Sequence, residues 1–293
     1  MGSIQSGRRA TATLMRALFL IPGGSSQQLQ AFAAVDAVKQ QLQAEVQVVC
    51  PPATTPLWQL HPAVVKAIPF AFEGASLADW ANLLGSVREP DFQLVINLAS
   101  GRQVDLMLSM SHIPTRIAAA GFSATERIEA PSAGWANQTL EAYLRPIGVT
   151  LNAEAFRLPI AKPTLDKASQ ALPAGDGPVL LLAPAGGSND WHQSLWQQLP
   201  ERIRTKLPSL RAISAAAASA SASQRAAQVA TADVVLASDP LTIEWALLLG
   251  VPLVALGRAA GTLPVRQGVQ GVGNPGELSS LSLEAVLLAL GLG

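Results

Sequence analysis

The chain has few of the residues that build disulfide frameworks and metal centres. It contains one cysteine, Cys50, and three histidines, His61, His112 and His192, among 293 residues. A single cysteine excludes a disulfide framework within the chain, and its place at the end of the apolar run 46–49 indicates a small buried side chain. The histidines lie in separate segments without ligand spacing, so the sequence predicts no metal site. This cysteine usage fits a reducing cytoplasm.

Net charge is also absent. Twenty basic residues balance 20 acidic ones, and only 14% of the residues are charged. Such a protein has no electrostatic field that would attract nucleic acid or anionic lipid nonspecifically. We therefore expect no nucleic-acid partner. The hydrophobic content of 49% supplies core for two domains, the usual number for a chain of this length.

No apolar run is long enough to cross a bilayer. The run 14–21 is interrupted by Arg16 and leads into a Pro-Gly-Gly turn, which is typical of a first core strand. A myristoylation pattern at Gly2 and an arginine pair before the run are too weak to predict targeting. We expect residues 1–14 to be a disordered extension. We expect a cytoplasmic protein, with peripheral association at the inner face of a membrane as the alternative.

The most informative segment is 232–257. An apolar strand ends at Ser238, a helix follows to Leu249, and a Gly-Val-Pro turn leads into a second apolar strand, a pattern typical of a parallel αβ unit. The N-terminus of such a helix favours an anion, and an acidic residue there can instead hold a sugar hydroxyl. Asp239 occupies this corner. It is also a preferred N-cap for a helix that begins at Pro240, and both roles are compatible.

A strand–loop–helix pattern occurs at the start of each half of the chain. A strand at 18–21 is followed by a glycine loop and a helix at 27–42, and a strand at 178–183 is followed by the loop 184–190 and a helix at 193–207. Further helices are expected at 77–86, 103–109, 135–147 and 281–290, and strands at 46–49, 92–98 and 116–120. The segment 150–177 resembles a linker. We predict an α/β protein with an N-terminal domain at 15–170 and a C-terminal domain at 171–293.

Three segments, 16–24, 184–189 and 239–257, resemble glycosyltransferase family 9 in order and spacing over nearly the whole chain. This family contains the ADP-heptose:lipopolysaccharide heptosyltransferases. The segment 140–148 is similar to the family's helix before the interdomain linker. The resemblance implies two Rossmann-like domains that face each other across a cleft, the GT-B arrangement. It also implies sugar transfer from a nucleotide-sugar, such as ADP-heptose, to an envelope glycan or another hydroxylated acceptor, with no cofactor.

The resemblance assigns candidate site residues to three loops. The acceptor-side loop of the N-terminal domain comprises Gly23, Gly24, Ser25 and Ser26, followed by Gln27 at the position of the family's general base. The nucleotide-sugar side of the C-terminal domain comprises Gly186, Gly187, Ser188, Asp239, Leu241 and Glu244. Ligands of open parallel sheets bind outside the carboxyl ends of the strands, so we expect these loops to converge on one cleft.

The sequence departs from the family pattern at these loops. Gln27 replaces an aspartate, and an amide cannot take a proton from a hydroxyl near neutral pH. The family's Asp-Ser-Gly motif retains only Asp239, with Leu241 in place of the glycine and Glu244 where a histidine would follow. A basic residue after the second glycine loop is missing, and Asp190 in that stretch would repel a diphosphate if it pointed inward.

These departures leave two hypotheses. The first is an active glycosyltransferase with another base, for which Glu73, Asp105 and Glu244 are the remaining, poorly placed carboxylates. The second is a catalytically inactive pseudoenzyme that keeps the fold as a binding or assembly module for a protein partner. A nicotinamide-dependent oxidoreductase is a distant third, because neither half contains a GxGxxG pattern with an acidic residue downstream.

Overall fold

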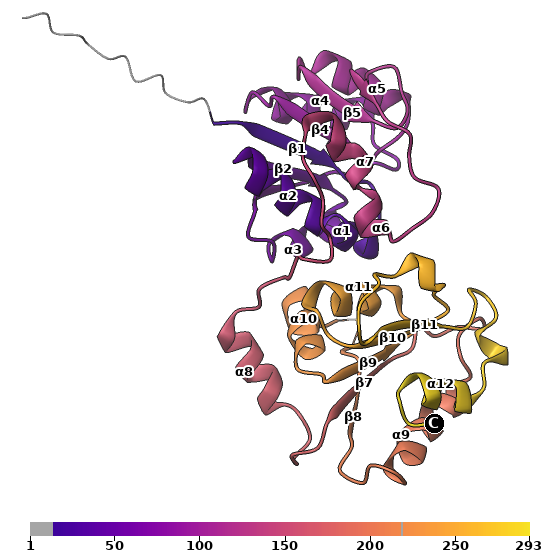
Figure 1. Cartoon of the computed structure of the whole chain (residues 1–293). Helices are drawn as coiled ribbons and strands as arrows, with labels where there is room; N and C mark the ends of the chain where they lie inside the picture. Colours follow the sequence, from indigo (N-terminus) through magenta and orange to yellow (C-terminus); the bar gives the residue numbers. More distant parts are fainter. Residues whose placement is uncertain (1–13, 218) are drawn as a thin grey trace, which may run out of the picture.

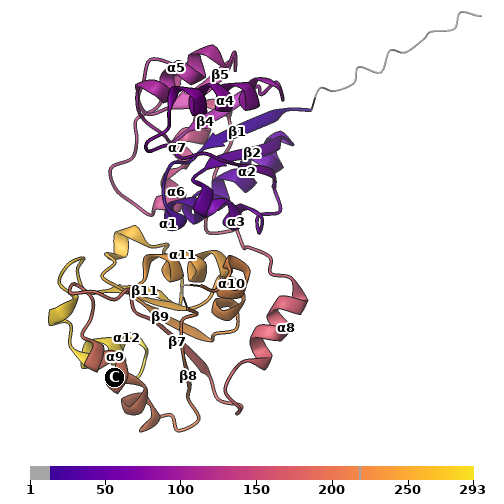
Figure 2. The same ribbon diagram turned by 180° about the vertical axis from the view of Figure 1, so that it is seen from behind.

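A computed structural model describes residues 14–217 and 219–293, and it contains two parallel sheets (Figures 1 and 2). Residues 1–13 of the predicted extension lie outside this part of the chain. The first sheet has the order β3-β2-β1-β4-β5-β6, with β1 Arg16–Leu20, β2 Glu45–Cys50, β3 Val64–Pro69, β4 Leu94–Asn97, β5 Thr115–Ala118 and β6 Glu126–Arg127. The second has the order β11-β10-β9-β7-β8, with β7 Val179–Ala183, β8 Arg211–Ser214, β9 Val234–Ala237, β10 Leu253–Leu256 and β11 Val269–Val272.

Helices flank both sheets. Those associated with the first sheet are α1 Ser25–Gln30, α2 Phe32–Leu42, α3 Thr55–Trp58, α4 Leu77–Arg88, α5 Arg102–Met110, α6 Ala136–Thr139 and α7 Glu141–Leu144. The later helices are α8 Lys162–Gln170, α9 Gln193–Arg204, α10 Ala222–Ala230, α11 Pro240–Leu249 and α12 Leu283–Ala289. Short 3-10 helices occur at η1 Pro52–Thr54, η2 Arg145–Ile147, η3 Ala260–Thr262 and η4 Leu278–Ser280.

The central strands are apolar throughout because each sheet is covered on both faces. In β1, Ala17 and Phe19 belong to the core beneath α1 and α2, whereas Leu18 and Leu20 belong to the core beneath α4 and α5. All four side chains are buried. Strands buried on both faces are continuous apolar runs rather than alternating ones. The same holds for β7, which explains why both strands are evident in the sequence.

The two Rossmann-like domains contact each other through helices. α1 packs against α11, and α3 packs against α10, so the lower edge of the first domain rests on the upper helices of the second (Figure 1). One continuous cluster of buried apolar residues extends from β1 and α2 to β9 and α11. The interdomain contact is therefore part of a shared core.

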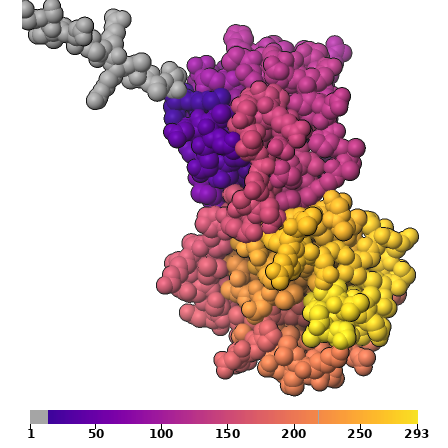
Figure 3. All heavy atoms as spheres, viewed as in Figure 1, coloured from indigo at the N-terminus to yellow at the C-terminus, as the bar shows by residue number. Residues whose placement is uncertain are grey.

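The segment 150–161 crosses the junction between the domains and leads into α8 (Figure 3). The sequence pattern predicted a linker over 150–177, but α8 forms within it and packs against α10 of the second domain. This helix has no buried residue and few apolar ones, so its hydrophobic signal in the sequence is weak. We propose that the domain boundary lies within 150–161, before α8, rather than at residue 171.

Other differences from the predicted elements have local causes. The helix expected at 27–42 is two helices, α1 and α2, separated at Ala31. The helix expected at 135–147 is broken into α6, α7 and η2, and it ends as predicted at Gly148, which has a left-handed φ of 71°. The edge strand β8 is only partly buried, so its sequence carries little hydrophobic signal.

Candidate active site

A cavity of about 900 Å³ opens in the N-terminal domain. It lies beyond the carboxyl ends of β1 and β4, which are neighbours in the sheet although other elements separate them in sequence. In parallel sheets this reversal of strand order is the usual ligand site. The lining residues are Ile21, Pro22, Gly23, Gly24, Gln27, Gln30, Phe72, Glu73, Gly74, Ala75, Trp80, Leu98, Ala99, Ser100, Gln103, Val104, Ala136, Thr139, Leu140 and Tyr143.

The acceptor-side loop forms one wall of this cavity. Gln27 Oε1 accepts a hydrogen bond of 2.8 Å from the Gly24 N–H, so the side chain folds back onto its own loop. A Cβ atom on Gly23 would lie 2.1 Å from Gln27 Oε1, which is why a glycine occupies that position. Ser25 and Ser26 begin α1 behind this wall. At the position that the resemblance assigns to a general base, the structure therefore contains an amide that stabilises the start of a helix.

Gln28, which the sequence analysis did not single out, fixes the loop from behind. Its side chain is fully buried, and its Nε2 donates to the carbonyls of Ile21 at 2.9 Å and Gly23 at 2.7 Å. The indole Nε1 of Trp58 donates to Gln28 Oε1 at 2.7 Å. A glutamine among apolar positions of a predicted helix was the only available signal. Its three hydrogen bonds determine the shape of the cavity wall.

Of the three alternative carboxylates, only Glu73 lines the cavity. Its side chain is exposed and forms no hydrogen bond or ion pair with residues 14–217 or 219–293. Asp105 is buried instead, where its Oδ1 accepts from Ser123 Oγ at 2.6 Å. Tyr143 also lines the cavity, and burial raises the pKa of its phenol. Glu73 is consequently the carboxylate best placed to meet a ligand.

The second glycine loop is closed by its own aspartate. Asp190 is buried, and its carboxylate accepts hydrogen bonds from the N–H groups of Gly186 at 2.8 Å and Trp191 at 2.7 Å. Gly186 and Gly187 have left-handed φ angles of 76° and 92°, which allow the loop to curl around the carboxylate. The Asp190 carboxylate thus points into its own loop. It accepts a hydrogen bond from an amide that could otherwise bind an anion. Ser188 lies exposed in the same loop.

The side chain of Asp239, at the N-terminus of α11, also has its hydrogen-bond partners within the chain. Asp239 Oδ2 accepts from the Thr242 N–H at 2.8 Å and from Thr242 Oγ1 at 2.6 Å, which makes Asp239 the N-cap of α11. Ser238 Oγ accepts from the Ala185 N–H at 2.8 Å, so this corner and the second glycine loop do converge. Leu241 packs against the shared core.

Glu244 lies in the interdomain contact. It is 2% exposed, and its Oε1 accepts a hydrogen bond of 2.9 Å from Gln30 Nε2 of α1 and lies 3.6 Å from Arg258 Nη2. Its Oε2 has no partner among the described residues. Burial raises the pKa of Glu244, and this effect exceeds the opposing ones of Gln30, Arg258 and Asn137. Glu244 is therefore buried behind Gln30, which itself lines the cavity.

The structure brings helix α1 of the predicted acceptor side into contact with helix α11 of the predicted nucleotide side. Gly23, Gly24 and Gln27 line the cavity, whereas Gly186, Gly187, Ser188, Asp239, Leu241 and Glu244 do not. Gln30 of α1 also donates a hydrogen bond to Glu244 of α11. Among residues 14–217 and 219–293, no group of three or more His, Cys, Asp or Glu residues could hold a metal ion.

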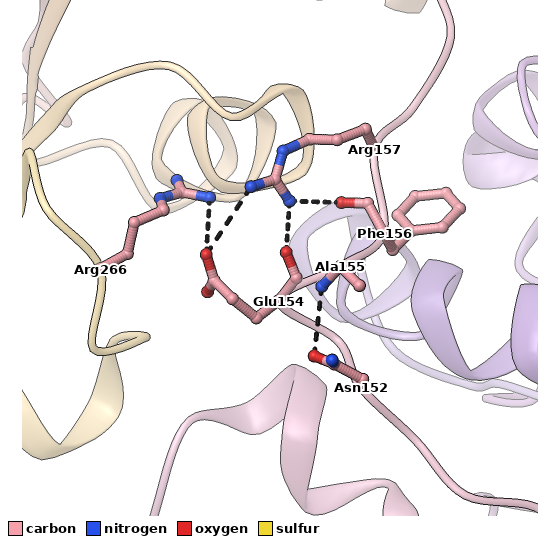
Figure 4. Close-up of polar contacts among 6 residues, drawn as sticks. All are labelled: Asn152, Glu154, Ala155, Phe156, Arg157 and Arg266. Carbon is pink, nitrogen blue, oxygen red and sulfur yellow. Dashed lines mark hydrogen bonds and ion pairs between the residues drawn. The ribbon is translucent and has the colours of Figure 1, made fainter.

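The interdomain segment is held by both domains. Glu154 accepts a hydrogen bond of 3.2 Å from Arg266 Nη1 of the C-terminal domain and pairs with Arg157 at 3.6 Å (Figure 4). Phe156 stacks on His61 of the N-terminal domain with ring centroids 5.6 Å apart. His61 Nδ1 accepts from the Ala63 N–H, so the proton is on Nε2, which faces the Phe32 carbonyl at 3.0 Å. Burial lowers the pKa of His61 from 6.5 to about 4.

No family model and no curated protein sequence matches the chain. Solved structures do. The ADP-heptose lipopolysaccharide heptosyltransferase II of E. coli superimposes with a TM-score of 0.72 at 15% identity, over 94% of this chain and 98% of that one. A family 9 glycosyl transferase from Veillonella parvula DSM 2008 gives 0.76 at 13% identity, over 94% and 96%. E. coli heptosyltransferase WaaC with ADP gives 0.69 at 14% identity, over 94% and 99%.

The chain has the GT-B fold of the heptosyltransferases. The predicted resemblance to glycosyltransferase family 9 is confirmed at the level of fold, over almost the whole of each heptosyltransferase chain. The predicted fold class of two Rossmann-like domains is confirmed as well. Within the described residues, no helix is both long and apolar enough to cross a bilayer.

Proposed function

We propose that this protein is a glycosyltransferase that transfers a sugar from a nucleotide-sugar to a hydroxylated acceptor bound in the N-terminal cavity. One observation supports this proposal above all. In a heptosyltransferase-like fold, a cavity of about 900 Å³ lies at the carboxyl ends of β1 and β4, lined by the loop that the family resemblance assigns to the acceptor. Its volume is within the usual range for ligand pockets, roughly 300–1,000 Å³.

The chemistry requires an acceptor oxygen that attacks the anomeric carbon while the nucleoside diphosphate leaves. A base that takes the hydroxyl proton in this step contributes roughly 10²–10⁴ in rate. Gln27 cannot take a proton, and its Oε1 already accepts from Gly24. Glu73 is the one carboxylate on the cavity lining, so we assign the role of base to Glu73.

A second candidate, a pseudoenzyme, is favoured by a specific observation on the C-terminal domain. The amides and hydroxyl that could hold a diphosphate already donate to Asp190 and Asp239 of the chain itself. A diphosphate at either site would displace a carboxylate or lie beside it, and like charges repel. In this alternative, the protein keeps the acceptor cavity and loses donor binding.

Donor binding separates the two candidates. The full chain would be heated with ADP, UDP, GDP and a panel of their sugar conjugates, because a ligand at a hundred times its Kd stabilises the folded state by about 2.7 kcal/mol. The glycosyltransferase proposal expects a shift in Tm with at least one nucleotide-sugar, and release of its nucleoside diphosphate when acceptors are added. No shift with any of them would overturn it and support the pseudoenzyme.

Restoring the family's carboxylate supplies a matched test of the chemistry. For an enzyme with its base at Glu73, Glu73→Gln lowers kcat about 10²-fold or more with little change in donor Kd. Gln27→Asp in the Glu73→Gln background should recover part of that loss, because Gln27 lines the same cavity. Glu126→Gln, an exposed substitution in β6, serves as the control. Unchanged kcat in Glu73→Gln would exclude Glu73 as the base.

A further inference from the structure

Within the described part of the chain, the side chains that line the N-terminal cavity carry no positive charge, which bears on the kind of sugar that it can hold. Among the described residues of the lining, none is lysine, arginine or histidine. Glu73 is the one acidic or basic residue of this lining, and burial moves the pKa of Tyr143 upward. Anions in proteins are normally held by Arg or Lys, often through bidentate hydrogen bonds.

The N-terminus of α1, where Gly24 and Gln27 line the cavity, supplies one competing electrostatic effect, and helix α5 supplies another. The first turn of α5 begins beside the cavity, where Ser100 and Gln103 line the wall and Gly101 provides no side-chain cap. A helix N-terminus corresponds to about half a unit of positive charge, and its effect falls off within one turn. Glu73 carries a full negative charge. Arg102 is exposed and does not belong to the lining, so Glu73 is the one fully charged side chain among the described lining residues.

The remaining lining combines aromatic rings with uncharged polar groups. Phe72, Trp80 and Tyr143 are half-buried, and Trp80 is held in place by an edge contact with Phe70, with ring centroids 4.6 Å apart. Ser100 and Gln103 form no side-chain hydrogen bond with the described residues. Amides and hydroxyls both donate and accept, which suits ligand hydroxyls, and aromatic rings offer apolar surface to the C–H faces of a sugar.

We propose that this cavity selects an uncharged, polyhydroxylated acceptor, such as a neutral oligosaccharide, and discriminates against acceptors that carry phosphate or carboxylate groups. The inference rests on the proposed glycosyltransferase function and specifies the substrate class of the same site. An anionic group brought beside Glu73 without a cationic partner is expected to weaken binding roughly tenfold or more.

Matched pairs of ligands test the charge preference. Maltotriose and α-1,4-galactotriose would be titrated into the full chain, each against a charged counterpart, 6-phosphorylated maltotriose and α-1,4-linked trigalacturonate. Binding would be followed by the indole N–H resonance of Trp80, assigned with Trp80→Phe. We expect the neutral trisaccharides to shift this resonance and to bind at least about tenfold more tightly than their counterparts. Charged ligands that bind as tightly as neutral ones, or neutral ones that leave Trp80 unaffected, would overturn the proposal.

Two variants show whether Glu73 causes the discrimination. Glu73→Gln should reduce the ratio of the two Kd values in each pair of ligands to about threefold or less. This substitution removes the repelling charge while keeping the size of the side chain. Glu126→Gln, which lies outside the cavity, should leave this ratio of Kd values unchanged. An unchanged ratio of Kd values in Glu73→Gln would refute the claim that the charge of Glu73 causes the discrimination. Failure of every trisaccharide to bind would refute the acceptor class alone, because the nucleotide-sugar measurements test glycosyl transfer independently.

Discussion

At the scale of single residues, two buried polar side chains near the cavity stand out. Gln28 joins Ile21, Gly23 and Trp58 through three hydrogen bonds. His61 is held neutral by burial between Phe32 and Phe156. Neither residue was assigned from the sequence, because a glutamine and a histidine in apolar surroundings become informative only when their partners, distant in the chain, are known. Gln28 supports the loop that lines the cavity, and His61 contacts the interdomain segment through Phe156.

Gln28→Leu should destabilise the protein by about 2–4 kcal/mol, because it leaves the Trp58 indole N–H and two buried carbonyls without partners, each costing about 1–3 kcal/mol before relaxation. Urea unfolding at neutral pH measures this loss. Gln40→Leu makes the same substitution at an exposed position of α2. It should alter the stability by less than about 0.5 kcal/mol. Equal effects of the two substitutions would show that the Gln28 network is not important for stability.

His61 should make the stability fall as the pH decreases from about 6.5 to about 4. The folded pKa is near 4 and the unfolded value near 6.5, so the unfolded chain takes up the proton first and gains up to about 3 kcal/mol over this window. Urea unfolding at several pH values would measure the slope for the wild type and for His61→Gln, which should be less dependent on pH. His112→Gln, at an exposed position, is the control. Parallel slopes for wild type and His61→Gln would contradict the assignment.

At the scale of elements, the parallel αβ units were predictable and their partners were not. The unit from β9 through α11 to β10 matches the prediction because its strands are continuous apolar runs and its helix has an Asp-Pro start and a glycine end. The elements α8, β8 and β11 were missed, since β8 and β11 are only partly buried and α8 has no buried residue. The burial of Glu244 was missed because it depends on α1 of the other domain, which no local pattern reports.

The second glycine loop yields a prediction about the element it opens. Asp190→Ala should lower the stability by about 2 kcal/mol, because two charge-assisted hydrogen bonds to amides are lost. The freed Gly186 and Trp191 amides should then bind an external anion, so pyrophosphate should raise the Tm of this variant more than that of the wild type. Asp176→Ala, at an exposed position before β7, controls for the loss of one charge. An identical response of all three proteins to pyrophosphate would contradict this account of the loop.

At the scale of the whole molecule, the interdomain segment connects two domains that share one apolar core. Leu158 N–H donates to the Leu248 carbonyl at 3.0 Å, Phe156 stacks on His61, and Glu154 binds Arg266. The two predicted α/β domains followed from the repeated strand–loop–helix pattern, and the GT-B arrangement followed from the resemblance to glycosyltransferase family 9. The fixed orientation of the domains did not, because it depends on side chains that meet only after both sheets have formed.

The Glu154–Arg266 pair should therefore contribute to the stability of the assembled domains. A double-mutant cycle with Glu154→Gln and Arg266→Gln should give a coupling free energy of about 1 kcal/mol, measured by urea unfolding. The exposed pair of Glu201 and Arg204 within α9 is the matched comparison and should give less than about 0.5 kcal/mol. A coupling at Glu154–Arg266 no larger than that of the α9 pair would show that it does not secure the domains.

The position of Gln30 has a consequence for how the two halves communicate. This side chain belongs to the cavity wall and also donates to Glu244 across the domain junction. A ligand that moves α1 on entering the cavity must alter that hydrogen bond, and any event in the C-terminal domain that moves α11 must alter the cavity. Thermodynamic reciprocity then requires that each event change the equilibrium constant of the other by the same factor.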